Sequence, residues 1–240
     1  MFQNPNMRSR RQPIRRKSDA APVSLYSHLI AAHRACQQPF REAGLHELAG
    51  KREWLWEGDL GYVVVDFYSR RPYPNLKVPG AIRVRSGIGW YWQPELIPHT
   101  WRNVSRGTEI PFYPGDDWSR PVQEVLADGL RFLQDGQSVL ANLPAFLETL
   151  GESNRATQVP IAILKALVGE SAPARALLED YLPWSEEHAP SEQESELALG
   201  AVHATGSRVQ MFAFLSPRIE AGRAIARQMY RGSDSDSKDG

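Results

Sequence analysis

Three consecutive segments in the first half of the chain alternate apolar and polar residues, and this pattern constrains the fold more than any other feature. Alternation with a period of two is typical of β-strands that bury one face. Gly58-Asp59 and Gly61 lie between the first two segments and favour a tight hairpin turn there. The sequence therefore predicts an antiparallel sheet of three or more strands. The segments are residues 51–57, 62–68 and 81–92.

The same alternation divides the aromatic residues of these strands between two faces. One face is strongly apolar and is predicted to be buried: Trp54, Trp56, Val63, Val65, Phe67, Ile82, Val84, Ile88, Trp90 and Trp92. The other face is mixed: Glu53, Glu57, Tyr62, Asp66, Tyr68, Arg83, Arg85 and Tyr91. We expect a cross-strand ion pair between Asp66 and an arginine. Gly87 and Gly89 predict a weak point or a bulge in the third strand.

Helical periodicity predicts what covers this sheet. Residues 24–43 repeat apolar side chains every three or four positions and end at Gly44, although Pro39 is expected to kink the helix or end it early. Further helices are predicted over residues 121–134, 137–150, 156–168 and 172–182. The long connection between residues 94 and 121 has room for another short strand. The predicted fold class is α+β, with an antiparallel sheet packed by an N-terminal helix and followed by a helical second half.

Composition divides the chain into five segments. Both ends are rich in charged or small polar residues and are predicted to be flexible. The segments are a basic arm (1–22), the α+β domain (23–183), an acidic linker or exposed loop (184–206), an amphipathic helical segment (207–231) and a disordered tail (232–240).

Charge and cysteine content narrow the classes of function. The 28 acidic and 28 basic residues cancel, so the molecule as a whole has no field that attracts polyanions. The single cysteine, Cys36, cannot form an intramolecular disulfide, which favours a reducing compartment such as the cytoplasm. No apolar run approaches the roughly 18 residues that a membrane span requires. The arginine pairs near the N-terminus are not followed by the apolar segment of an export signal. We therefore expect a cytoplasmic protein with no membrane association.

Motifs with high specificity for catalysis or metal binding are absent from the sequence. Cys36 belongs to the apolar stripe of the first predicted helix, which favours a small buried hydrophobic residue over a nucleophile. The best candidate for a metal site is His99 with Asp116 and Asp117, although an Asp pair at this position is more typical of a turn or a helix cap. We predict no catalytic residue, no metal and no cofactor. A small metal-assisted hydrolase that uses these three residues remains a third hypothesis.

The aromatic and arginine residues suggest recognition of another molecule. Tyr, Trp and Arg are the residues that most often anchor protein interfaces. The residues predicted to bind a protein partner are Tyr62, Tyr68, Arg83, Arg85, Tyr91, Trp101 and Trp118. The alternative in which the tryptophans fill the core stays open. A second hypothesis is the binding of single-stranded nucleic acid by the sheet face and the basic arm. The arm residues are Arg8, Arg10, Arg11, Arg15, Arg16 and Lys17.

The order of these features resembles a bacterial family of unknown function, whose members have an N-terminal helix, a three-strand meander and a helical second half. The residues that carry the resemblance are Phe40-Arg41-Glu42-Ala43-Gly44-Leu45, Trp54-Leu55-Trp56, Tyr62-Val63-Val64-Val65-Asp66-Phe67, residues 81–92 and Leu130-Arg131-Phe132-Leu133. The resemblance supplies no catalytic residues and implies an accessory or binding role. Together with the anchor residues, it leads us to expect a bacterial cytoplasmic interaction protein of the immunity or adaptor type.

Overall fold

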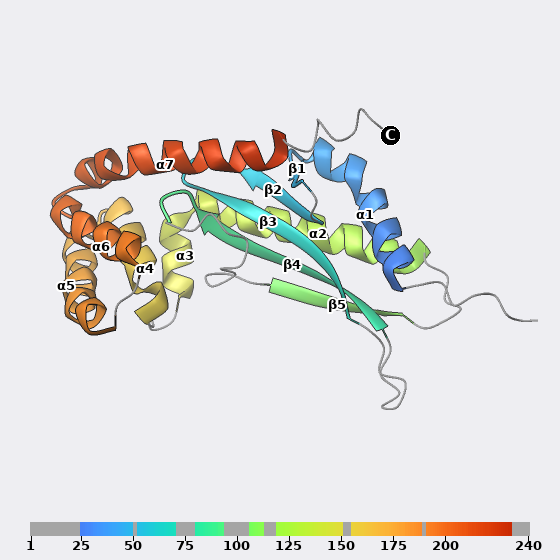
Figure 1. Ribbon diagram of the computed structural model, residues 1–240, viewed down its shortest axis with the longest axis horizontal. Helices are drawn as coiled ribbons and strands as arrows, with labels where there is room; N and C mark the ends of the chain where they lie inside the picture. Colours follow the sequence, from blue (N-terminus) through green and yellow to red (C-terminus); the bar gives the residue numbers. More distant parts are fainter. Residues whose placement is uncertain are drawn as a thin grey trace, which may run out of the picture.

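The computed structural model describes residues 25–49, 52–70, 80–93, 106–112, 119–150, 155–188 and 191–231. Within these residues the fold is α+β, with an N-terminal helix, an antiparallel sheet and a helical second half, as predicted (Figure 1). The strands are β1 (His46–Glu47), β2 (Glu53–Glu57), β3 (Gly61–Arg70), β4 (Gly80–Trp90) and β5 (Arg106–Phe112). The helices are α1 (Leu25–Glu42), α2 (Ser119–Ala141), α3 (Leu143–Thr149), α4 (Arg155–Leu167), α5 (Ser171–His188), α6 (Glu192–Ala204) and α7 (Arg208–Arg231).

The sheet is a five-stranded meander in which strand order follows chain order and every neighbouring pair is antiparallel. Strands β2, β3 and β4 confirm the three predicted strands. The pairing of β3 with β4 is continuous from Gly61↔Trp90 to Arg70↔Ala81, so the bulge expected at Gly87 and Gly89 is absent. Gly89 instead makes room for an aromatic ring, because a Cβ atom at this position would overlap the side chain of Tyr62.

Helices α1 and α2 cover one face of the sheet and form the first core. The side chains of Trp54, Val65 and Phe67 are buried there against Phe40 of α1 and Phe132 of α2. This is the face that the alternation predicted to be buried. The tryptophans of β2 therefore contribute to the core, in agreement with the alternative that the sequence left open.

The C-terminal end of α1 shows how local sequence positions this first core. The helix does not end at Pro39 but continues through it to Glu42. Gly44 then adopts a positive φ of 82°, and the N–H of Leu45 donates to the carbonyl oxygen of Phe40 at 2.9 Å. This hydrogen bond closes the last turn in the manner expected of a glycine at this position, and it turns the chain into β1.

Cys36 lies on the buried face of α1, with an exposed fraction of 0%. Burial raises the pKa of its thiol to about 12, so the thiol stays protonated at neutral pH. The structure thus confirms that Cys36 is a buried apolar residue.

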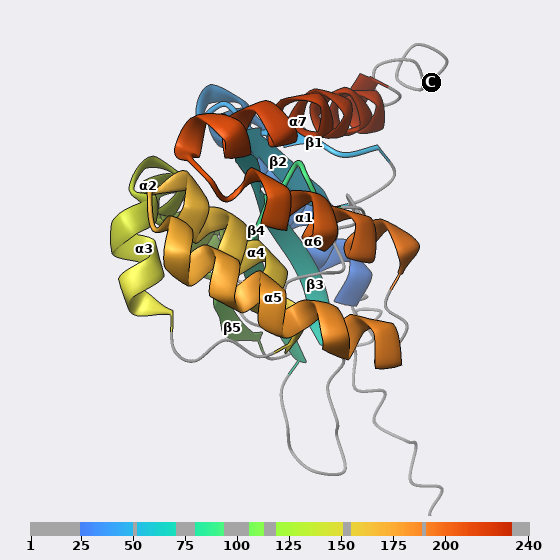
Figure 2. The same cartoon turned by 90° about the vertical axis from the view of Figure 1, so that its left-hand side faces the viewer.

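The second core joins the helical half of the chain to the end of the sheet. Figure 2, which views the molecule from its helical end, shows α4, α5 and α6 stacked in front of the strands. Leu164 of α4, Leu178 of α5 and Met211 of α7 are buried in this core together with Trp90 and Trp92. Helix α2 runs without a break from Ser119 to Ala141, whereas the sequence predicted two helices there.

The acidic linker or exposed loop predicted over residues 184–206 is wrong, because helices occupy most of it. Helix α5 continues to His188, and α6 begins at Glu192 with Ser191 as its N-cap. The acidic side chains of Glu192 and Glu196 are exposed, while Leu197 and Ala201 on the other face are buried. Helix α6 is therefore amphipathic. Its apolar face is short and the residues around it are acidic, so the sequence pattern did not indicate a helix.

The predicted helical segment 207–231 is confirmed as α7, and it packs back onto the sheet. Arg227 pairs with Glu57 of β2 at 3.3 Å, and Arg223 donates hydrogen bonds to the carbonyl oxygens of Gly58 and Asp59 at 3.0 and 2.7 Å. The N–H of Ala49 donates to the carbonyl oxygen of Met229 at 3.2 Å. Two arginines of α7 therefore serve an intramolecular contact.

Candidate functional site

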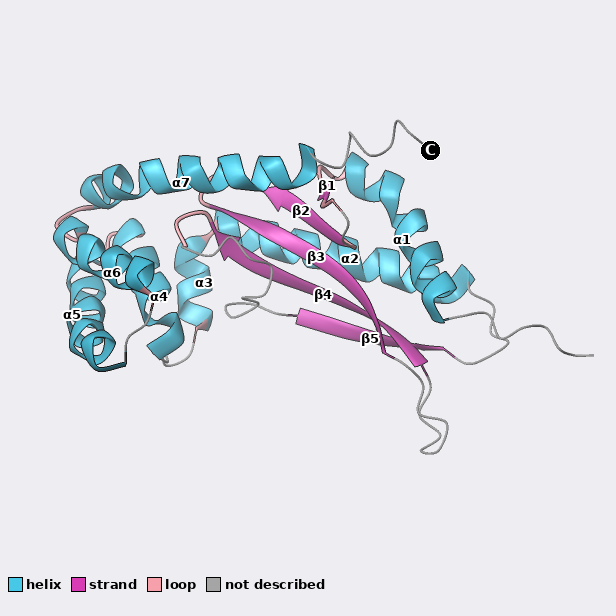
Figure 3. Cartoon of the chain, in the orientation of Figure 1, coloured by secondary structure: helices cyan, strands magenta, loops and turns pink. Residues whose placement is uncertain are grey.

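The outer face of the sheet, opposite α1 and α2, carries the candidate site. Figure 3 shows α2 behind the strands and no described helix in front of β5 or the middle of β3. The register of β3 and β4 pairs Asp66 with Arg85 and Tyr68 with Arg83. The register of β4 and β5 pairs Arg83 with Glu109. We call these five residues the charge–aromatic cluster. Their side chains share one face because each strand alternates and the three strands are in register.

Hydrogen bonds and ring contacts connect the whole cluster. Arg83 donates from Nε to Oε2 of Glu109 at 2.6 Å and from Nη1 to the hydroxyl oxygen of Tyr68 at 3.0 Å. The guanidinium carbon of Arg85 lies 4.3 Å from the centroid of the Tyr68 ring, and its Nη2 donates to the Asp66 carboxylate. The ring of Tyr68 is thus held by both arginines, each of which is anchored by a carboxylate.

Burial differs between the two ends of the cluster. Asp66 is nearly buried, with an exposed fraction of 6%, whereas the side chains of Arg83 and Arg85 are 40% and 35% exposed. Hydrogen bonds to Tyr68 and Glu109 raise the pKa of Arg83, so its charge is secure at every physiological pH. The cluster presents fixed guanidinium and aromatic groups to solvent, which suits noncovalent recognition.

The surroundings of the cluster do not favour the nucleic-acid hypothesis. Both arginines already pair with carboxylates, and Glu53 of β2 lies directly opposite Asp66 in the register. A phosphate backbone is attracted by uncompensated positive charge, which the arginines described in the cluster do not offer. The arm residues Arg8, Arg10, Arg11, Arg15, Arg16 and Lys17 lie outside the described residues.

Among the described residues, the structure brings three of the predicted partner-binding residues together at the surface: Tyr68, Arg83 and Arg85. The expectation that Tyr62 and Tyr91 belong to an exposed face is wrong, because their exposed fractions are 5% and 2%. Their rings lie 5.4 Å apart in the second core, and burial raises the pKa of Tyr62 to about 12. The guanidinium of Arg223 lies 5.5 Å from the ring of Tyr91, so α7 covers this end of the face.

Trp101 and Trp118 lie outside the described residues, as do His99, Asp116 and Asp117 of the metal hypothesis. Within the described residues, no group of three or more His, Cys, Asp or Glu side chains could hold a metal ion. The ion pair of Asp66 with an arginine is confirmed, whereas Glu109 was not among the predicted site residues. Its alternation with Ile110 was a usable signal, but the strand is short and contains Pro111.

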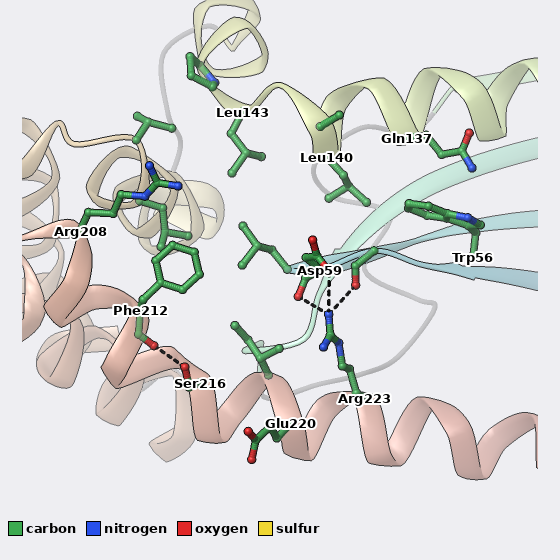
Figure 4. Close-up of a pocket in the computed structure, with 17 residues that line it drawn as sticks. Trp56, Asp59, Gln137, Leu140, Leu143, Arg208, Phe212, Ser216, Glu220 and Arg223 are labelled. Carbon is green, nitrogen blue, oxygen red and sulfur yellow. Dashed lines mark hydrogen bonds and ion pairs between the residues drawn. The ribbon is translucent and has the colours of Figure 1, made fainter.

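A pocket lies at the other end of β3. The pocket has a volume of about 770 Å³ and is bounded by α7, the turn between β2 and β3, and the ends of α2 and α4 (Figure 4). Leu60 belongs to this pocket, and Tyr68 follows eight residues later along the chain, which corresponds to about 25 Å of extended strand. The pocket and the charge–aromatic cluster are therefore separate sites.

Comparison of the chain with protein families, with curated proteins and with solved structures found no match. Among the described helices, none combines the length and apolar character needed to cross a bilayer.

The ion pair of Asp66 and Arg85 is expected to contribute measurably to stability. In a double-mutant cycle with Asp66→Ala and Arg85→Ala, we expect a coupling energy of about 1–2 kcal/mol, because Asp66 is nearly buried and accepts from a charged donor. The measurement is urea unfolding of the wild type, both single variants and the double variant.

The exposed pair of Arg175 and Glu179 on α5 supplies the control for this cycle, because its nitrogen–oxygen distance is 3.0 Å but both side chains are more than half exposed. Its coupling energy should stay below about 0.5 kcal/mol. Equal coupling in the two cycles would contradict the buried position of Asp66.

Proposed function

We propose that this protein is a noncatalytic interaction module that binds another protein through the outer face of its sheet. The observation that carries the proposal is the arrangement of Tyr68, Arg83 and Arg85, which lie on neighbouring strands and remain partly exposed. Tyr and Arg are enriched among the residues that dominate binding energy in protein interfaces. The charge–aromatic cluster would serve as the anchor of such an interface.

Preorganisation of the cluster supports this proposal. A free arginine loses rotamer entropy when a partner immobilises it, and that loss weakens binding. Here Glu109 and Tyr68 already hold Arg83, while Asp66 and the Tyr68 ring already hold Arg85. The strands beneath them are the longest of the sheet. A partner would therefore meet anchors whose geometry is set before binding.

A cytoplasmic location agrees with the proposal, because the single cysteine is buried as a thiol and does not depend on an oxidising compartment. The bacterial origin and the immunity or adaptor role rest on the resemblance in layout alone.

The test compares three tagged proteins as baits in lysate of the source organism: the wild type, the double variant Tyr68→Ala/Arg83→Ala, and the control variant Arg175→Ala. The control removes an arginine of an exposed ion pair on α5, away from the sheet. Circular dichroism and thermal melting first establish that all three are folded. Captured proteins are identified by mass spectrometry, and each candidate is then purified and titrated against the three baits.

The proposal predicts a purified protein that binds the wild type and Arg175→Ala with the same affinity and binds the double variant at least tenfold more weakly. Equal affinity for all three baits would overturn it. Capture of nucleic acid alone, with an affinity that falls steeply with salt, would also overturn it and support the alternative function.

A further inference from the structure

The pocket beneath α7 has the composition of a binding site for a small amphipathic molecule. Its walls are mostly apolar, and they come from four separate parts of the chain. The side chains that form them include Trp56, Leu60, Leu140, Leu143, Phe212 and Ile219. Pockets of 300–1,000 Å³ with apolar walls and a few polar groups are typical of small-molecule sites, and about 770 Å³ falls within this range.

The charged groups of the pocket are distributed unevenly. Arg223 is engaged by the carbonyl oxygens of Gly58 and Asp59, and the Asp59 carboxylate lies 3.5 Å from its guanidinium. Figure 4 shows this arrangement in the middle of the pocket, with Arg208 and Trp56 at opposite ends. The charge of Arg223 is therefore largely compensated by the protein.

Arg208, in contrast, forms no ion pair within the described part of the chain. Its guanidinium carbon lies 5.6 Å from the centroid of the Phe212 ring, and no described carboxylate or carbonyl accepts a hydrogen bond from it. The other acidic group of the pocket, Glu220, lies twelve residues further along α7, which corresponds to about 18 Å of helix. This separation exceeds the Debye length of about 8 Å at physiological salt. The Arg208 end of the pocket is thus locally positive.

We infer that this pocket binds a small organic anion, with a carboxylate on Arg208 and an aliphatic or aromatic body along the apolar walls. A carboxylate matches the planar donors of a guanidinium. The apolar body would lie beside Phe212 and reach toward Leu143 and Leu140, which Figure 4 places across the pocket from α7. This inference does not depend on the protein-binding role of the sheet.

The inference is tested with two competitors of equal chain length, one with a charged carboxylate head group and one with a neutral hydroxyl. The fluorescent anion 1-anilinonaphthalene-8-sulfonate is bound to the full-length protein and then displaced with decanoate or with the neutral decan-1-ol. Four variants accompany the wild type. Arg208→Ala removes the proposed anion partner, and Ser216→Trp fills the pocket from an exposed position on α7. Arg175→Ala and Tyr68→Ala/Arg83→Ala lie outside the pocket, and circular dichroism verifies that each variant is folded.

We expect decanoate to displace the dye from the wild type at about tenfold lower concentration than decan-1-ol. The reason is that only the carboxylate of decanoate can form a charged hydrogen-bonded pair with Arg208. Arg208→Ala should remove this preference, and Ser216→Trp should abolish displaceable binding. The two variants outside the pocket should behave as the wild type. Equal displacement by decanoate and decan-1-ol in the wild type, or unchanged binding in Ser216→Trp, would overturn the inference. Because Tyr68→Ala/Arg83→Ala changes the sheet face and leaves the pocket intact, its binding of the dye tests the pocket separately from the proposed interaction function.

Discussion

Replacement of Trp54 by alanine is expected to lower the free energy of unfolding by about 3–5 kcal/mol. Trp54 is completely buried at the centre of the first core, on strand β2. Its ring meets Phe40 of α1 edge to face, with 5.4 Å between the centroids, and lies 5.5 Å from the ring of His33. The substitution would leave a cavity between α1 and the sheet that these rigid neighbours cannot close.

Urea unfolding followed by far-ultraviolet circular dichroism measures this effect. The matched control is Trp184→Ala on α5, where the ring is only half-buried and stacks on the exposed His188 at 4.7 Å. We expect the control to lose about 1–2 kcal/mol, since less apolar surface returns to water and no enclosed cavity forms. A loss at Trp54 as small as that at Trp184 would contradict the packing of α1 on the sheet.

Replacement of Gly222 by alanine is expected to destabilise the protein, although alanine is the better helix former. In an exposed helix this change would stabilise by about 1 kcal/mol. In α7, however, a Cβ atom at Gly222 would overlap the carbonyl oxygen of Tyr91, which belongs to the backbone and cannot rotate away. We expect a net loss of about 1–3 kcal/mol, because α7 must shift from the sheet or Tyr91 must move.

The same urea experiment tests Gly222→Ala, and Ala224→Gly on the exposed side of α7 is its control. Intrinsic helix propensity predicts a loss of about 1 kcal/mol for the control. If propensity alone governed α7, the two substitutions would change stability in opposite directions. An increase in stability for Gly222→Ala would show that α7 does not approach Tyr91 as closely as the structure describes.

These two positions illustrate how differently the sequence and the three-dimensional packing constrain the chain. The alternation in residues 51–57 already predicts that Trp54 faces the core, since strand geometry assigns successive side chains to opposite faces. Nothing in the neighbourhood of Gly222 predicts its role, because its neighbour Tyr91 lies more than a hundred residues away in the sequence.

The candidate site was partly predictable for the same reason. Tyr68, Arg83 and Arg85 occupy polar positions of alternating strands, so their common face and the pairing of Asp66 with an arginine follow from the strand pattern. Tyr62 belongs to the same face by alternation, yet it is buried. Its ring packs against Tyr91 in the second core, and α7 in turn covers Tyr91. No local pattern indicates that a helix from the end of the chain covers that end of the sheet.

Short-range periodicity, and the glycine that ends α1, were sufficient to define the α+β class, the order of β2 to β4 and the buried position of Cys36. These features depend on contacts between near neighbours or on the geometry of a single strand or helix. The helix α6, the burial of Tyr62 and Tyr91 and the pocket beside Arg208 depend on packing between distant segments. The free energy of that packing comes from surfaces that meet only in the folded chain, and a sequence pattern read one segment at a time does not contain it.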